Sequence, residues 1–184
     1  MHVRRHRLGM HAATILALSA LATGCGRMVA IKYEATNPWK GQGAVTVVPF
    51  RYEAAEDHRV SPREVETNRA ANTELYLSQE IGAFFTEAFR RELAHSGYRI
   101  EESSPRTVSG AITRFFVDWL EDERFFELHA VYTVGSVAEN GFAWECSSIQ
   151  RGPNALAQDS VLIRRGTADC MQRFIRAAQD AHVL

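Results

Sequence analysis

Residues 124–134, RFFELHAVYTV, alternate between apolar and polar side chains. Every second residue from Phe126 to Val134 is apolar, and Glu127, His129 and Thr133 lie between them. A period of two is typical of a β-strand that buries one face and turns the other to solvent. The stretch therefore predicts a half-buried sheet, and Glu127, His129 and Thr133 are candidate contact residues on its solvent face.

Two more strands are expected beside this one, which we place at Arg124–Val137. Thr107–Leu120 precedes it across the acidic turn Glu121–Glu123, and Phe142–Gln150 follows it. The second connection contains Asn140-Gly141, a dipeptide that favours a tight hairpin turn. Three consecutive antiparallel strands follow from this spacing.

Two amphipathic helices are expected around these strands. In Ser78–Ser96 the apolar residues recur at helical spacing, and Gly97 follows where a left-handed C-cap is favoured. A second helix is expected from Asp159 to the end of the chain. The apolar stripe of the first helix consists of Ile81, Phe84, Phe85, Ala88, Phe89 and Leu93.

Two further strands complete the expected fold. Ala44–Phe50 is β-branched and almost entirely apolar, and Tyr98–Glu101 directly follows the first helix. The pattern predicts an α+β fold: a two-layer sandwich whose mainly antiparallel sheet of about five strands carries two amphipathic helices on one face.

A long polar stretch, Arg51–Glu74, separates the first strand from the first helix. Connections of this length are uncommon in compact domains unless they hide an element or serve a function. Ser61-Pro62, with Glu64 following, is typical of a helix start. We expect a short helix there, flanked by loops that form a second candidate contact surface.

The N-terminus is typical of an export signal. Arg4, Arg5 and Arg7 precede an apolar run over residues 12–22, which is too short to span a bilayer. The sequence LATGC at residues 21–25 resembles the lipobox of bacterial lipoproteins, with Ala22 in the position that Leu usually occupies. An ordinary signal peptide, or a buried N-terminal helix with an incidental cysteine, is the alternative.

The lipobox resemblance implies a processed and acylated protein. Cleavage would follow Gly24, and Cys25 would carry a diacylglyceryl group and an acylated amino terminus, palmitate being a typical acyl chain. Gly26 stands where an inner-membrane retention signal favours Asp. The resemblance thus implies an outer-membrane lipoprotein facing the periplasm. The expected division is a signal peptide (1–24), a lipidated Cys and tether (25–43) and one α+β domain (44–184).

A wider resemblance covers most of the mature chain. The lipobox, the tether, the VTVVPF strand at residues 45–50, the helix ending at Gly97 and the three-strand meander with its C-terminal helix resemble small periplasmic lipoproteins of the YajG type. More distantly, the order resembles lipoproteins of curli secretion and penicillin-binding-protein activation. This resemblance implies an accessory or assembly role and supplies no catalytic residue and no cofactor.

Charge and motifs argue against several function classes. The formal net charge is −1, and removing residues 1–24 takes away three arginines and makes it −4, which does not favour nucleic-acid binding. The chain has no nucleophile elbow and no phosphate- or dinucleotide-binding glycine loop. His58, His95, His129 and His182 show no metal-ligand spacing. We expect no catalytic residues, no metal and no cofactor.

If Cys25 carries lipid, Cys146 and Cys170 remain as a pair. Cys146 shares strand parity with Phe142 and Trp144, and Cys170 lies at the margin of the buried face of the last helix. In an oxidising compartment the two could form a disulfide. Two buried free thiols are the alternative, because sequence does not give the Cα separation.

The expected function is therefore that of a lipid-anchored, non-catalytic accessory module that binds an envelope protein partner. The alternative is a periplasmic binder of a small molecule, lipid or glycan, held between the aromatic helix and the sheet. Glu127 and His129 could also be no more than a solvated cross-strand polar face.

Overall fold

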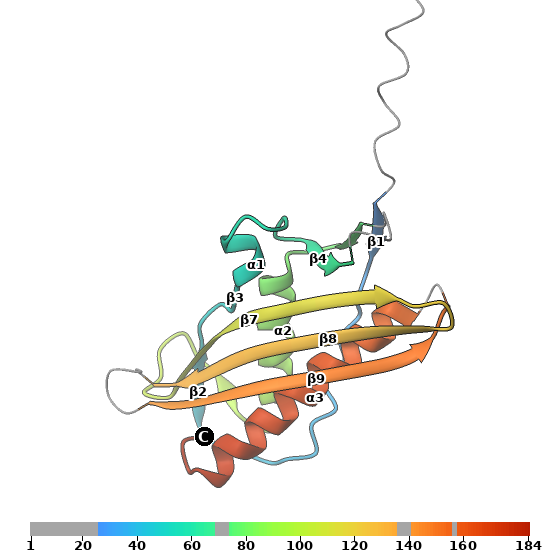
Figure 1. Ribbon diagram of the computed structural model, residues 1–184. Helices are drawn as coiled ribbons and strands as arrows, with labels where there is room; N and C mark the ends of the chain where they lie inside the picture. Colours follow the sequence, from blue (N-terminus) through green and yellow to red (C-terminus); the bar gives the residue numbers. More distant parts are fainter. Residues whose placement is uncertain (1–25, 69–73, 136–140, 156–157) are drawn as a thin grey trace, which may run out of the picture.

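The computed structural model describes residues 26–68, 74–135, 141–155 and 158–184. Its elements follow one another along the chain and pack around one core (Figure 1). They are β1 (Arg27–Val29), β2 (Ala44–Val47), β3 (Arg51–Tyr52), α1 (Glu53–Glu56), β4 (Glu64–Thr67), β5 (Leu75–Leu77), α2 (Ile81–His95), β6 (Arg99–Ile100), β7 (Thr107–Trp119), β8 (Glu123–Val134), β9 (Phe142–Pro153) and α3 (Gln158–Asp180).

Strand β7 organises the sheet. On one side it pairs antiparallel with β8 from Val108↔Val134 to Trp119↔Arg124, and β8 pairs antiparallel with β9. On its other side β2, β3 and β4 each pair in parallel with a different part of β7. The meander β7–β8–β9 confirms the three long strands that the alternation predicts.

The sheet is nevertheless larger than the five mainly antiparallel strands expected. It has nine strands in the described residues, and five of its eight strand pairings are parallel. The structure also contains a third, four-residue helix, α1. The additional strands β1, β3, β4 and β5 have two to four residues each, too few to show a period of two.

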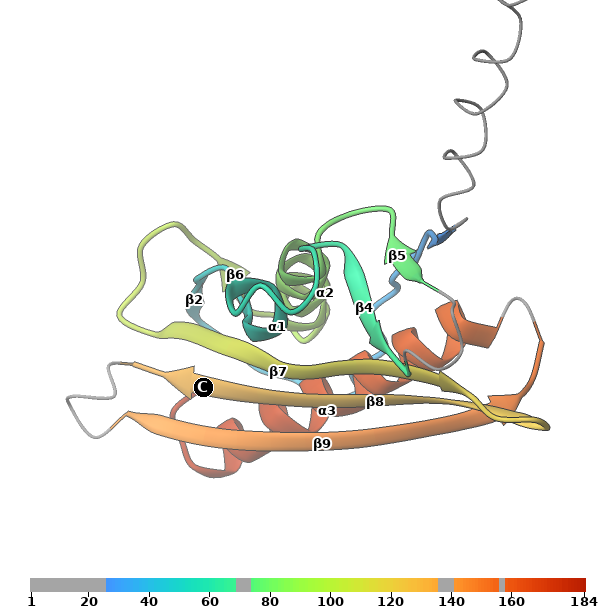
Figure 2. The same ribbon diagram turned by 45° about the horizontal axis from the view of Figure 1, so that its top comes forward.

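Both long helices pack behind the sheet, as Figures 1 and 2 show. Helix α3 lies against β8 and β9, and α2 lies beside it. The interface between these layers is aromatic: Tyr132 of β8 stacks on Phe174 of α3 with 4.4 Å between ring centroids, and Phe85 and Phe89 of α2 lie 6.1 and 5.8 Å from Tyr132. The predicted apolar stripe of α2 is thus core. Gly97 ends the helix with φ of +98°.

The stretch Arg51–Glu74 is not a free loop in its described part. Tyr52 and Ala54 are buried, and Val65 of β4 lies in the same core. The helix expected at Ser61 is wrong: the carboxylate of Glu64 accepts from the Ser61 amide at 3.0 Å, as in a helix start, but the chain then continues as strand β4. The pairing of β4 with β7 overrides the local signal.

The segment expected as a tether is also packed on the fold. Tyr33 and Asn37 are buried, and β1 pairs in parallel with β5. The division between a tether and a domain at residue 44 stays a prediction about the mature protein. Within the described part of the chain, no helix is long and apolar enough to cross a membrane.

Candidate functional site

The face of β7, β8 and β9 opposite the helices is the candidate site, and we refer to it as the outer face. No helix of the described chain covers it, as Figure 1 shows. Strand β8 alternates strictly between half-buried residues on this face and buried residues on the other. The outer face is formed by Ser109, Ala111, Arg114, Phe116, Asp118, Phe125, Glu127, His129, Val131, Thr133, Ala143, Glu145, Ser147, Ile149 and Arg151.

A chain of charged groups crosses the middle of the outer face. The Arg114 guanidinium donates to a carboxylate oxygen of Glu127 at 3.2 Å, and the other oxygen lies 3.1 Å from Nε2 of His129. The Glu127 side chain is 22% exposed, less than either neighbour. Two residues singled out by the sequence are therefore in direct contact, and Arg114 adds a cation.

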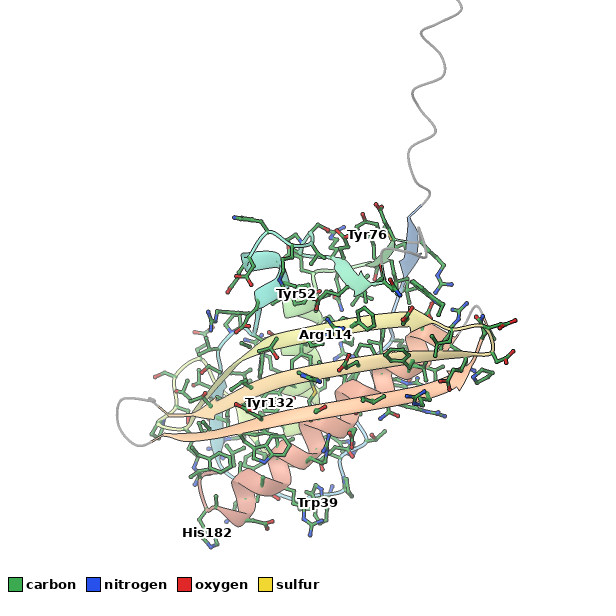
Figure 3. All side chains as sticks on the ribbon, viewed as in Figure 1. Trp39, Tyr52, Tyr76, Arg114, Tyr132 and His182 are labelled. Carbon is green, nitrogen blue, oxygen red and sulfur yellow. A yellow bond between two sulfur atoms is a disulfide. The ribbon has the colours of Figure 1, made fainter. Side chains whose placement is uncertain are left out.

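Aromatic rings lie beside this charged chain. Arg114 stands over the ring of Phe116 at 4.1 Å, and Phe116 lies 5.8 Å from Phe125. Arg151 stands over Phe125 at 5.7 Å. A cation held over an aromatic face loses side-chain freedom, so the side chains in this part of the outer face are ordered by contacts within the chain. Figure 3 shows Arg114 on the outer face.

Thr133 lies further along the same face. It pairs with Ser109 on β7 and Ala143 on β9, and Val131 separates it from His129 on the strand. The expected set of three residues is thus a contacting pair, Glu127 and His129, with Thr133 on the same surface but outside the charged chain.

A small pocket of about 190 Å³ opens where β4 meets the outer face. Arg114 and Phe116 line it from β7, and Glu66 and Arg59 line it from the other side. Glu66 is buried and accepts from the Arg59 guanidinium at 2.8 Å and from the Phe115 amide at 3.1 Å. Both oxygens of this carboxylate therefore already accept a hydrogen bond within the chain, so Glu66 lines the pocket as a structural residue.

Sequence reasoning missed Arg114, Phe116 and Glu66. The register of β7 shifts between Ile112 and Arg114, so alternation counted from the start of the strand places Arg114 on the wrong face. The available signal was cross-strand pairing: basic and aromatic residues on β7 would be expected opposite the stretch of β8 that contains Phe125 and Glu127.

The N-terminal end of the described chain is fixed to the fold. Gly24 and Cys25, the expected cleavage and lipidation residues, lie outside the described residues. Gly26 packs closely on the ring of Tyr76. A Cβ at this position would lie 2.6 Å from the ring, so the contact leaves no room for a side chain. Arg27 begins β1 and donates its amide to the Glu74 carbonyl at 2.9 Å. In Figure 3, Tyr76 lies close to β1.

Arg27 also reaches a buried ionic cluster. Its guanidinium pairs with Asp159 in the first turn of α3, and Arg124 donates to both oxygens of the same carboxylate at 2.9 Å. Asp159 is fully buried. Burial lowers the pKa of Arg124 and the charge of Arg27 lowers it further; burial also lowers the pKa of Arg27. One carboxylate thus holds two cations, and an acidic group in the first turn also favours the helix N-terminus.

The structure joins Cys146 and Cys170 in a disulfide with 5.6 Å between their Cα atoms. The bond ties β9 to α3 on the inner side of the sheet. Arg173 donates to the Cys146 sulfur at 3.0 Å and to the Ser147 carbonyl at 2.6 Å. The disulfide expected from the cysteine count is therefore present.

The space between the aromatic helix and the sheet is filled by side chains. Phe50 packs on Phe85 and Phe89 at 5.1 and 5.5 Å, and Tyr132 closes the group. This packing does not favour a ligand site under α2. In the described residues, no group of three or more His, Cys, Asp or Glu side chains is arranged to hold a metal ion.

No family model matches the chain, and no curated protein sequence does either. Solved structures share its fold. A crystal structure of a Xanthomonas campestris protein of family DUF330 is similar with a TM-score of 0.62 at 9% identity, covering 85% of this chain and 99% of that one.

A protein described only as uncharacterized has a TM-score of 0.50 at 8% identity, covering 82% of this chain and 99% of its own. Rare lipoprotein B from Shewanella oneidensis has a TM-score of 0.43 at 8% identity, covering 78% and 97%. Identities this low show a common fold and nothing about activity. The chain therefore has an α+β fold that is also found in the Xanthomonas campestris protein.

Proposed function

We propose that this protein is a lipid-anchored accessory module of the bacterial envelope that binds a protein partner through its outer face. The observation that carries the proposal is the ordered arrangement of Arg114, Glu127 and His129 beside Phe116 and Phe125, on a sheet face that no helix of the described chain covers. Aromatic residues and arginines are the types enriched where proteins bind one another.

The anchoring part of the proposal rests on the sequence. The basic N-terminus, the short apolar run and the lipobox at residues 21–25 support acylation of Cys25. Gly26 at the next position supports the outer membrane over the inner membrane, with the domain on the periplasmic side. The resemblance to YajG-type lipoproteins supports an accessory role in assembly, and a non-catalytic one.

The position of Arg27 adds a physical consequence. If Cys25 is acylated, Gly26 alone separates the lipid from a residue held by β5 and Asp159. The domain would then sit close to the bilayer in one orientation, and it could reach only partners in or near the same membrane.

Two measurements test the anchor. Cells grown with labelled palmitate should incorporate label into the wild-type chain and not into a Cys25→Ser variant, and only the wild type should sediment with membranes. Equal labelling of both chains, or membrane association of the variant, would contradict the lipoprotein assignment without bearing on the outer face.

The partner surface is tested separately by a photo-crosslinking amino acid at His129 in intact cells. The expected result is one adduct with a specific envelope protein, weakened about ten-fold or more by Glu127→Arg, because this substitution removes the carboxylate that orders Arg114 and His129 and places a cation beside Arg114. The matched control is Glu87→Arg on α2, an exposed carboxylate that pairs only with Arg91 among the described residues. Equal loss in both variants, or no adduct at His129, would contradict the assignment of the outer face.

A further inference from the structure

Strand β9 is an exposed edge of the sheet. In the described part of the chain it pairs only with β8, over twelve residues, and Figure 2 shows it at the margin of the sheet with α3 behind. An edge strand presents a row of unpaired backbone donors and acceptors, which is a template for another strand.

The contact with Arg173 shows which backbone groups face outward. Arg173 donates to the Ser147 carbonyl at 2.6 Å, and Ser147 lies opposite His129 in the ladder. The His129 carbonyl in turn accepts from Thr113 on the β7 side. In an antiparallel ladder the direction alternates residue by residue, so Glu145, Ser147, Ile149 and Arg151 all turn their backbone groups away from β8.

Of the devices that protect natural edge strands, β9 has two charged residues, Glu145 and Arg151, but no bulge-forming irregularity in its pairing with β8. Its proline, Pro153, stands at the last position, and no lysine occurs in β9. Arg173 covers one carbonyl, that of Ser147, with a side chain that is 46% exposed and also pairs with Asp169, so among the described residues an incoming strand has to displace only this one contact at the edge. Ile149, an apolar residue in the middle of the edge, is 53% exposed.

The charges along β9 are complementary to the same strand reversed. Glu145 and Arg151 both lie on the outer face and are symmetric about Ser148. In the described residues Glu145 has no ion-pair or hydrogen-bond partner, whereas Arg151 pairs with Glu123. We propose that a second copy of this chain pairs its β9 antiparallel with this one, around a two-fold axis at Ser148.

In that register Glu145 lies opposite Arg151 of the second copy, and the symmetry gives the reciprocal ion pair as well. Ser147 lies opposite Ile149 of the second copy, and the two Ile149 side chains become diagonal neighbours across the axis, which removes apolar surface from water. Sliding one strand by two residues puts Glu145 opposite Ile149 or Pro153 and loses both ion pairs. The charges thus select one register, and the backbone hydrogen bonds supply the attachment.

The pairing joins two meanders into one six-stranded antiparallel sheet. The two-fold axis runs perpendicular to the sheet, so the two outer faces become a single surface and both chain starts lie at the same height along the axis. Two lipid anchors, as proposed above, could therefore reach one membrane. An interface between identical surfaces of this kind is closed and does not grow into a fibre.

Exchanging the charges at positions 145 and 151 tests whether a second copy of the chain pairs with the β9 edge. The full-length mature protein, solubilised in detergent, is measured by light scattering and sedimentation over a concentration series. Glu145→Arg and Arg151→Glu should each weaken dimerisation about ten-fold or more, and the double variant should return to within about three-fold of the wild type. The matched control is Glu102→Arg, an exposed carboxylate outside the sheet. A monomeric wild type at every concentration, or a double variant no better than the single ones, overturns the proposal.

A second pair of variants tests the edge itself. Ser147→Pro removes an outward amide that β8 does not use, so the monomer should fold and fail to pair, whereas Ser147→Ala should pair as the wild type does. A photo-crosslinking amino acid at Ser147 in cells should give an adduct of twice the chain mass. An adduct with a different protein would show a foreign strand on this edge and overturn the second copy as its occupant.

Discussion

The hydroxyl of Tyr33 donates a 2.6 Å hydrogen bond to the carboxylate of Glu92, and both side chains are buried. The same carboxylate accepts from the amides of Asn37 at 2.9 Å and Thr36 at 3.2 Å. The Glu92 carboxylate on α2 therefore accepts hydrogen bonds from three residues of the N-terminal segment, Tyr33, Thr36 and Asn37. Hydrogen bonds to a carboxylate are strong, so these three contacts attach the N-terminal segment firmly to α2.

Glu92→Ala should lower the free energy of unfolding by about 3 kcal/mol, because it leaves two buried donors, the Tyr33 hydroxyl and the Asn37 amide, without their carboxylate acceptor. Chemical denaturation followed by circular dichroism measures the change. Glu87→Ala is the control: it lies on the same helix, is exposed and should change stability by less than about 0.5 kcal/mol. Similar losses in the two variants would show that Glu92 does not hold the segment.

Sequence alone indicated little of this contact. Tyr33 and Asn37 fall in a stretch without a period, and the Glu92 position is visible only as a carboxylate on the apolar side of an amphipathic helix. A buried carboxylate requires donors, but the burial of Glu92 and the identity of its donors become known only from the structure. The two long helices and the three long strands were predictable because each spans enough residues to display its period.

Asp159→Asn should lower the free energy of unfolding by about 3 kcal/mol, since it leaves the buried Arg124 without its carboxylate. It should also loosen the start of the chain, where Arg27 uses the same group. Thermal unfolding and limited proteolysis near residue 27 measure the two effects. Asp169→Asn, whose side chain is 40% exposed beside Arg173, is the matched control and should leave both nearly unchanged. A loss of stability without faster cleavage would show that Asp159 stabilises the fold but does not hold the start of the chain at Arg27.

On the outer face, the residues of β8 could be predicted from the sequence and those of β7 could not, because only β7 has an irregular register. Alternation in β8 placed Glu127 and His129 correctly because that strand is regular along its whole length. Strand β7 carries an irregularity at Ile112–Arg114, so its side chains change face part of the way along. The parallel partners of β7 are set by contacts between distant segments, which a window along the sequence does not contain.

Reduction of the Cys146–Cys170 disulfide should lower the free energy of unfolding by about 3 kcal/mol, from the entropy of the 24-residue loop that it closes. Denaturation with and without reductant measures this change. A Cys146→Ser, Cys170→Ser double variant should match the reduced wild type and no longer respond to reductant. Thiol titration of the denatured, unreduced, mature protein should find neither cysteine reactive. Two reactive thiols would instead show that the pair is free.

Alkaline pH should destabilise the protein through its buried tyrosines. Burial raises the pKa of Tyr33, with a further contribution from Glu92, and burial also raises the pKa of Tyr52 and Tyr132. A group whose folded pKa is raised contributes stability below its unfolded pKa of about 10 and loses it as the pH rises above that value. Absorbance near 295 nm should show three tyrosines ionising only together with unfolding. Their ionisation in the native protein near pH 10 would contradict the burial.

Two tyrosines of similar burial should respond in opposite ways to loss of the hydroxyl. Tyr132 stacks on Phe174, and its hydroxyl has no hydrogen-bond partner in the described residues. Tyr132→Phe should therefore be neutral or stabilise by up to about 1 kcal/mol, because it removes an unsatisfied buried group and keeps the ring. Tyr33→Phe should instead cost about 1.5–3 kcal/mol, because its hydroxyl donates to the charged Glu92. Urea denaturation of the two variants side by side measures the difference. Equal destabilisation of the two variants would mean that the Tyr132 hydroxyl has a hydrogen-bond partner, such as an ordered water. Opposite signs would show that ring packing stabilises the core between β8 and α3, whereas the buried Glu92 carboxylate holds the N-terminal segment.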